Sequence, residues 1–398
     1  MSPSPRCGWS WADLWLVLVL AAPIWIAPGN PSQTLAAAYA VKSLVVLILI
    51  LPWLALAPRT QRLPRSALAV MAVVGAFTVS ALVHRQTDSV ELIDALLRVA
   101  LPLMAVAIAR STTAARTIVA GIVGLAGVLA VLAIIESLSV ELASEAQARP
   151  AVLLLHRNNV AFHLCTALPL CLAALMQVRT RGARLALAVV SIAVLAAIVV
   201  ARSRGAWLAA CAGTLPLLLV VPRVMAIRVA SVAAALAIAL GAWSAHAGLE
   251  PLSDRVRGAF DPVGEAAWFE RLAIYKHTLS RIAEHPLAGW GAGAFATRHT
   301  RFLDGRPADH PHNDLLTAGY EAGIGGALAL ATVLVLVTGG LVRRARRTRQ
   351  AVVAGLAGSM LAWCVAGAIN SPLSLSPSAV SFWLTVGAAL SLPRTEDT

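Results

Sequence analysis

A cluster of polar side chains precedes a long apolar run in the last quarter of the sequence. The stretch ADHPHNDLLTAGYEAGIGG begins at Ala308 and holds Asp309, His310, His312, Asn313 and Asp314. Asn and Asp are favoured helix N-caps, so Asn313 or Asp314 should begin the apolar helix, with His312 just before its N-terminus. Three interpretations are open from this stretch alone: a histidine general base, a metal site, or a polar loop next to a helix.

A second stretch, ARSRGAW, places two arginines between two apolar runs (Ala201–Trp207). Ser203 is a suitable N-cap for the following helix, which puts Arg204 in its first turn. A helix N-terminus beside a guanidinium is a good phosphate site, and Gly205 would allow a ligand close to the backbone. Alternatively, Arg202 and Arg204 are interfacial residues that reach lipid headgroups.

A third stretch, WFERLAIYKHTLSRIAEHPLAGWGAGAF, has helical spacing of its apolar residues up to Ile282. Arg271 projects from this helix, either as a ligand-binding or as a surface residue. Pro286 should end the helix at Glu284 and His285. The GWGAGAF segment is similar to a glycine-rich phosphate loop, but a turn that lets backbone pack tightly is the favoured interpretation.

The composition indicates the elements that must position these residues. Of 398 residues, 59% are hydrophobic and 13% are charged, whereas a soluble protein has about 25% charged residues. The apolar residues form blocks of about twenty, the length of a membrane-spanning helix. Lipid tolerates only helices or closed barrels, and the blocks do not alternate as strands do. The sequence therefore predicts an all-α polytopic membrane protein.

Approximately twelve spans are expected on this length criterion. They lie near residues 11–29, 35–57, 67–84, 92–109, 117–137, 159–178, 185–201, 205–222, 229–247, 315–342, 351–370 and 376–393. We expect a single transmembrane domain over residues 1–398. Residues 248–314, between the ninth and tenth spans, form its one large outer segment, built of short amphipathic helices on the membrane.

Arginines set the expected orientation. With a cytoplasmic N-terminus, short basic loops such as Arg179–Arg184 and the RRARRTR run from Arg343 all fall inside. The net charge of +13 is then explained by these loops, without nucleic acid. Both termini lie inside, and all three polar stretches lie on the outer face. The five cysteines lack CxxC spacing and indicate neither disulfides nor metal ligands.

Together the three stretches resemble the O-antigen ligase and O-antigen polymerase superfamily. The resemblance rests on Ser203-Arg204-Gly205, on Arg271, on HPLAGWGAGAF and on HPHNDLLTAGYEAGIGG. A further element, HRNNVA, matches the family's N-R-N-x-x-A with Arg157 and Asn158, although His156 stands at the first position. The resemblance covers mainly residues 150–326.

The resemblance implies a GT-C-like glycosyltransferase of the bacterial inner membrane. Such an enzyme moves O-antigen from undecaprenyl diphosphate to lipid A–core oligosaccharide at the periplasmic face. It implies a metal-independent, inverting reaction without a cofactor, in which His312 is the base and Arg204 and Arg271 serve the diphosphate. We assign substrate binding to five further residues: Arg202, His310, Asn313, Arg157 and Asn158. The expected partners are the glycan donor, the lipid A–core acceptor and the bilayer.

Rival functions share parts of this pattern. An O-antigen polymerase or a protein O-glycosyltransferase of the same superfamily would use the same donor chemistry with another acceptor. The outer segment contains little sequence that could form an additional domain, and it ends in H-x-H-N. Both features favour the ligase. A lipid or polysaccharide transporter would instead need ionisable residues and broken helices near the bilayer midplane. Asp94 and Arg98, four residues apart within a span, can pair with each other on one helix face.

Overall fold

The computed structural model describes residues 63–84, 89–111, 114–142, 151–152, 155–201, 203–221, 266–297, 310–374 and 376–393, with residues 45, 48, 49 and 308. Its longer helices are α3 (Ala67–His84), α4 (Ser89–Ile108), α5 (Ala114–Leu142), α6 (Arg157–Gln177), α7 (Arg181–Val200), α8 (Arg204–Thr214), α11 (Ala266–Glu284), α13 (Asp314–Thr348), α14 (Ala351–Ile369) and α15 (Ser376–Leu390). Short elements are β1 (Ala151–Val152), β2 (Leu155–His156), α12 (Ala294–Thr297), and the 3₁₀ helices η1 (Leu215–Leu219) and η2 (Pro372–Ser374).

The described residues form an all-helical fold apart from one short β pairing. The strands β1 and β2 are antiparallel and two residues long each, with Ala151 opposite His156. Six described helices are long and apolar enough to span a membrane: α3, α5, α6, α7, α13 and α14. The helical class is confirmed, whereas the predicted number of twelve spans stays a prediction.

Several predicted spans differ in the structure. The predicted span 205–222 is an eleven-residue α8 continued by the 3₁₀ helix η1, and Pro216 lies at this change. The predicted span 376–393 is the 15-residue α15. The predicted span 92–109 is α4, which carries Glu91 in its first turn. Predicted spans 11–29 and 229–247, nearly all of 35–57, and residues 248–265 and 298–307 of the outer segment lie outside the described residues.

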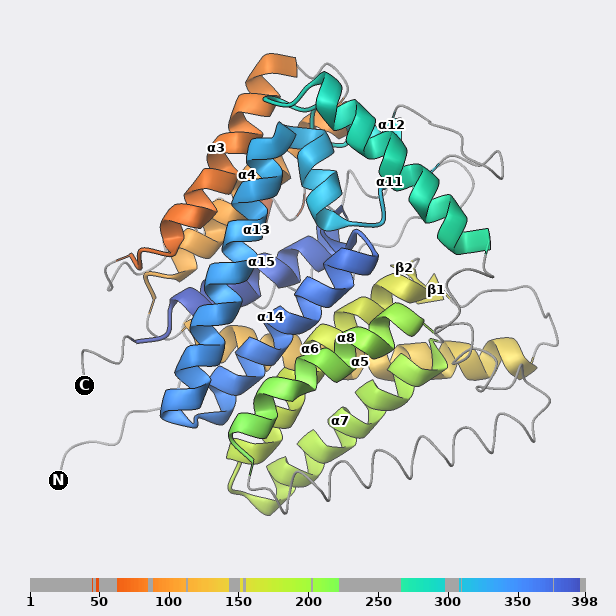
Figure 1. Ribbon diagram of the computed structural model, residues 1–398. Helices are drawn as coiled ribbons and strands as arrows, with labels where there is room; N and C mark the ends of the chain where they lie inside the picture. Colours follow the sequence, from red (N-terminus) through yellow and green to blue (C-terminus); the bar gives the residue numbers. More distant parts are fainter. Residues whose placement is uncertain are drawn as a thin grey trace.

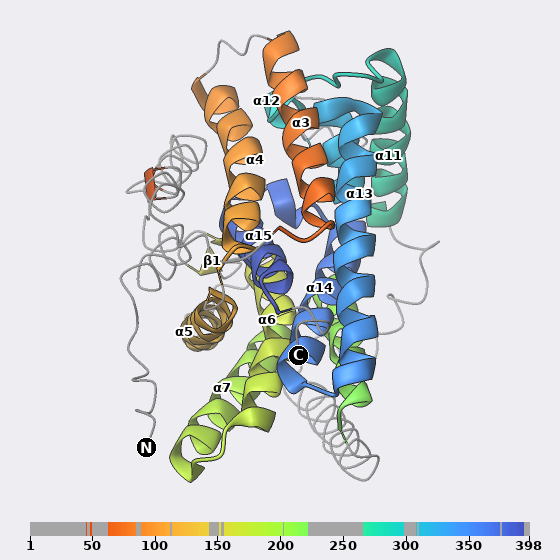
Figure 2. The ribbon, with the colours of Figure 1, turned by 90° about the vertical axis from the view of Figure 1, so that its left-hand side faces the viewer.

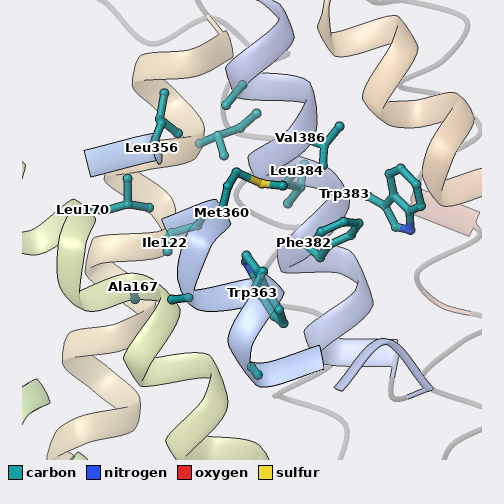
Figure 3. Close-up of a cluster of buried hydrophobic side chains, with 14 of the residues drawn as sticks. Ile122, Ala167, Leu170, Leu356, Met360, Trp363, Phe382, Trp383, Leu384 and Val386 are labelled. Atoms are coloured by element: carbon teal, nitrogen blue, oxygen red, sulfur yellow. The ribbon is translucent and has the colours of Figure 1, made fainter. Parts of the chain in front are cut away.

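The core is centred on α14, which packs against α6, α8 and α13. Close approach is possible because small residues line α14: a Cβ added at Gly355 or Gly358 would collide with α6. Small residues at such contacts are typical of membrane helix packing. Figure 3 shows Met360 and Trp363 of α14 among Phe382 and Leu384 of α15 and Leu170 of α6. The long α5 lies across the other helices, lengthwise in Figure 1 and end-on in Figure 2.

Helix α13 is broken near its start and folds back on itself. Ala322 (φ −129°, ψ 20°) and Gly323 (φ 70°, ψ −176°) are not helical. A Cβ at Gly326 would lie 2.9 Å from the Ala318 carbonyl oxygen, eight residues earlier in the chain. Residues 314–321 therefore form a short helix that runs back along the start of the long one, and Figure 1 shows the two parts at an angle.

The glycine-rich turn after α11 is docked on this break. Trp290 N–H donates to the Tyr320 carbonyl (2.8 Å), Gly291 N–H to the Glu321 carbonyl (3.1 Å), and Ile324 N–H to the Pro286 carbonyl (2.8 Å). The turn thus satisfies backbone groups that the break removes from the helix. The prediction of a tight-packing turn is confirmed.

Helix α11 has the predicted end at Glu284. It packs along α13, beside which it lies in both Figure 1 and Figure 2. Ile274, Thr278 and Ile282 form its buried face. Its opposite side exposes Phe269 and Leu272. The predicted outer segment therefore includes one well-formed 19-residue helix, whereas its predicted position on the membrane surface stays a prediction.

We expect Gly323→Ala to destabilise the fold and Gly325→Ala to leave it intact. A Cβ at Gly323 would lie 2.5 Å from the Pro286 carbonyl oxygen, at a positive φ that L residues rarely adopt. A Cβ at Gly325 meets nothing within 4 Å, and alanine is a better helix former by about 1 kcal/mol. Thermal unfolding of both variants in detergent measures the difference. Equal melting temperatures would contradict the docking described here.

Candidate active site

The start of α13 is the best-defined part of the predicted site. Asn313 is its N-cap: the side-chain oxygen accepts hydrogen bonds from Leu315 N–H and Leu316 N–H, both 3.0 Å. The Asn313 N–H donates to Ser371 Oγ (2.8 Å), and its Nδ2 donates to the Ala368 carbonyl (3.3 Å). Of the two predicted caps, the structure therefore selects Asn313. Its predicted role in substrate binding stays a prediction, and its amide already has a structural role.

His312 is held by contacts from three directions. It has φ 54°, a left-handed conformation uncommon for a residue other than glycine. Its carbonyl accepts a hydrogen bond from the Tyr275 hydroxyl of α11 at 3.2 Å. Its Nδ1 lies 3.1 Å from Asn370 Oδ1, directly after α14. The ring of His310 stands edge-on at 4.4 Å between centroids. These contacts fix the imidazole at a half-buried position.

Tyr275 connects α11, the helix that carries Arg271, to the His312 site. Arg271 and Tyr275 are one turn apart on α11, and both are half-buried. Burial raises the pKa of the Tyr275 hydroxyl, and the positive charge of Arg271 partly opposes that rise. Since the same hydroxyl donates to the His312 carbonyl, α11 links Arg271 to His312.

Arg204 approaches from α8. Ser203 is at the N-cap position with extended backbone, as predicted, but its side chain makes no capping hydrogen bond. A Cβ at Gly205 would lie 3.1 Å from both Ile369 of α14 and Phe162 of α6. Ile369 precedes Asn370, the partner of His312, so the first turn of α8 is packed directly beside the His312 site.

Of the other predicted binding residues, the structure describes Arg157, Asn158 and His310. Arg157 and Asn158 begin α6, the helix whose Phe162 packs on Gly205. His310 is in contact with His312, and its Nδ1 accepts from the His312 N–H at 3.4 Å. Arg202 and Asp309 lie outside the described residues. Among the described residues, no three His, Cys, Asp or Glu side chains are grouped to hold a metal ion.

A buried ion pair that the sequence did not predict lies beneath the site. Arg98 of α4 contacts Glu321 of α13 through Nε to Oε2 and Nη2 to Oε1, both 3.1 Å. Its Nη1 donates to the Leu373 carbonyl at 2.6 Å. Gly293 N–H donates to Glu321 Oε1 at 3.2 Å. The sequence suggested Asp94 as the partner of Arg98, four residues away on one helix face. The observed partner is 223 residues away.

The loop between α14 and α15 is a second feature that sequence reasoning missed. Asn370 contacts His312, and the Ser371 hydroxyl contacts the Asn313 N–H and the Thr317 hydroxyl. The Leu373 carbonyl accepts from Arg98, and the Leu373 N–H donates to Asp314. A cavity of about 30 Å³ lies under this loop, lined by Arg98, Asp314, Thr317 and Glu321 among others. Its lining is mostly apolar, but these four side chains offer polar partners, and a cavity of this size could hold a water molecule. The Asn-Ser pair after an apolar run was the only signal in the sequence.

We expect Glu321→Ala to cost about 3–5 kcal/mol of stability, because it leaves the Arg98 charge, whose side chain is 17% exposed, without its ion-pair partner. The double variant Arg98→Met with Glu321→Leu should recover much of that loss, since no uncompensated charge remains. A matched control is Glu284→Gln in the exposed Arg281–Glu284 pair, which should cost about 0–1 kcal/mol. Unfolding in detergent gives all three values. A double variant no better than Glu321→Ala would show that the charges are not coupled.

Comparison with known proteins supports the same region. The chain matches the family model described as O-antigen ligase over residues 189–331. No curated protein matches the chain. The matched region runs from α7 into α13, covers a little over a third of the chain, and contains the first turn of α8, all of α11 and the histidine pair. Residues 189–331, the range in which Arg204, Arg271 and His312 lie, therefore match the O-antigen ligase family, as the motifs predicted.

Proposed function

We propose that the protein is an O-antigen ligase. It transfers O-antigen polysaccharide from undecaprenyl diphosphate to the outer-core sugar of lipid A–core oligosaccharide, at the periplasmic face of the inner membrane. The family match and the apolar helices support a bacterial membrane protein that handles polysaccharide-linked lipids. One observation carries the finer proposal. Tyr275 joins α11 to His312, while the first turn of α8 packs on Ile369, the residue before the His312 partner Asn370. The helices that carry Arg204 and Arg271 thus both border the segments that hold His312.

Arg204 and Arg271 are proposed to bind the diphosphate of the donor. As the glycosidic C–O bond breaks, negative charge grows on the departing diphosphate and must be stabilised. Arg204 offers a planar pair of donors beside the first N–H groups of α8 and the positive end of its dipole. Arg271 adds a second guanidinium from α11. Two guanidinium groups can neutralise the diphosphate without a divalent cation, so no metal or cofactor enters the proposal.

His312 is the proposed general base. The acceptor sugar hydroxyl attacks the anomeric carbon on the face opposite the diphosphate, which inverts the configuration. The hydroxyl proton passes to His312 as the new C–O bond forms, and the diphosphate leaves with the bonding electron pair. His310 supports the orientation of His312 or contacts the acceptor. Arg202, Arg157, Asn158 and Asn313 are proposed to contact the substrates.

A transporter remains the alternative from another class, and two structural features favour it. Transporters use broken membrane helices and buried charges, and α13 is broken beside the Arg98–Glu321 pair. The position of the break supports the enzyme instead. The Ser80 hydroxyl donates to the Glu321 carbonyl at 2.6 Å, and Ser80 is only about one turn from the end of α3 at His84. The break is thus close to the end of a span, whereas a transporter would place it near the middle.

We expect Arg204→Ala, Arg271→Ala and His312→Ala each to abolish glycan transfer, with normal membrane expression. Arg204→Lys should also be poor, because an ammonium lacks the planar fork of donors. Arg281→Ala is the matched control on α11, since Arg281 stacks on Trp290 and pairs with Glu284. Transfer is measured with purified protein, defined donor and defined acceptor. Wild-type turnover in His312→Ala would remove the base assignment.

The acceptor distinguishes the ligase from its relatives. Purified protein receives a polyprenyl-diphosphate glycan with lipid A–core, with a second copy of the donor, or with an acceptor protein, in the presence of EDTA. We expect only lipid A–core to be glycosylated. Elongation of the second donor would identify a polymerase, and a modified protein would identify a protein O-glycosyltransferase. Movement of intact donor across vesicles without any transfer would instead identify a carrier.

A further inference from the structure

The side chain of Asn370 contacts His312, the proposed base, although nothing in the sequence motifs assigns Asn370 a role. It is the C-cap of α14, and its N–H donates to the Ala366 carbonyl at 2.8 Å, which fixes its backbone. Its side chain is 7% exposed, and its Oδ1 lies 3.1 Å from His312 Nδ1. The adjacent Ser371 holds the backbone of Asn313. The imidazole and the amide therefore meet at a position that is fixed from both sides.

The chemistry of this contact determines which nitrogen can act as the base. An amide oxygen only accepts hydrogen bonds, so the contact is a hydrogen bond only when Nδ1 carries the hydrogen. Neutral histidine then carries its lone pair on Nε2. When Nε2 takes a proton, Nδ1 keeps its hydrogen and its bond to Asn370. An orienting acceptor on the second nitrogen is how histidine bases are commonly held in one tautomer.

We propose that Asn370 is a positioning residue that holds His312 in the Nδ1–H tautomer and so presents Nε2 to the acceptor hydroxyl. This inference rests on the proposed function, because it needs His312 to be the base. The uncharged partner is consistent with that role. A carboxylate in the same place would stabilise the imidazolium and keep the base protonated to higher pH.

Other groups near His312 could influence the same pH dependence. On its own segment these are His310 and Asp314, and Asp314 Oδ1 accepts from Leu373 N–H at 3.1 Å. On α11 they are Tyr275 and Arg271, and the first turn of α8, which packs on Ile369, carries Arg204. Substitutions at position 370 leave all of these in place, so a change in pH profile would report on the Asn370–His312 contact.

The test compares Asn370→Leu and Asn370→Asp with wild type by measuring kcat and donor KM as functions of pH. For Asn370→Leu we expect kcat to fall about 100-fold with little change in donor KM, because the ring loses its orientation. For Asn370→Asp we expect higher activity than for Asn370→Leu. The acidic limb of the kcat–pH profile of Asn370→Asp should move to higher pH by about one unit or more, because a carboxylate beside His312 favours the protonated ring.

Ser374→Ala is the control in the same loop, since the buried Ser374 Oγ has no hydrogen-bond partner among the described residues, and it should keep the wild-type profile. Wild-type kcat in Asn370→Leu, or equal losses in both variants without a pH shift, would overturn the inference. If Asn370→Leu does not fold, an unshifted profile in Asn370→Asp overturns it alone. An active His312→Ala would instead refute the proposed function. An inactive His312→Ala beside a normal Asn370→Leu would refute only the role of Asn370.

Discussion

The break in α13 imposes the constraint on which the site depends. A helix that reverses direction leaves backbone N–H and C=O groups unpaired, and a membrane protein must satisfy such groups within the protein. Here the glycine-rich turn after α11 supplies backbone partners to Tyr320, Glu321 and Ile324. The Ser80 hydroxyl of α3 supplies another to Glu321. The reversal is therefore stable only while α3, α11 and α13 remain packed together.

The buried Arg98–Glu321 pair extends this arrangement from backbone to side chains. Glu321 precedes the break and accepts from Gly293 N–H in the docked turn. Arg98 binds Glu321 and also the Leu373 carbonyl, which belongs to the loop after α14. A single guanidinium thus connects α4, the break and that loop. Because the loop also carries Asn370, the charges beneath the site help to fix the residue that contacts His312.

Local features of this architecture could be predicted from the sequence, whereas long-range contacts could not. The end of α11 at Glu284 followed from Pro286, and the cap of α13 was narrowed to Asn313 or Asp314, because both features depend on neighbouring residues. The reversal at Gly323 was not predicted, since a glycine within an apolar run is also compatible with a continuous helix. The partners of Arg98 and His312 could not be predicted either. They lie 223 and 58 residues away, and only the packing of α4, α13 and α14 brings them together.

Arg204, Arg271 and His312 are proposed to share one pocket for a lipid-linked diphosphate. An experimental structure of the protein with a bound polyprenyl-diphosphate analogue would test this arrangement. We expect phosphate oxygens within about 3 Å of both guanidinium groups, with the anomeric position facing His312 Nε2. A diphosphate bound elsewhere, or contacted by neither arginine, would contradict this expectation.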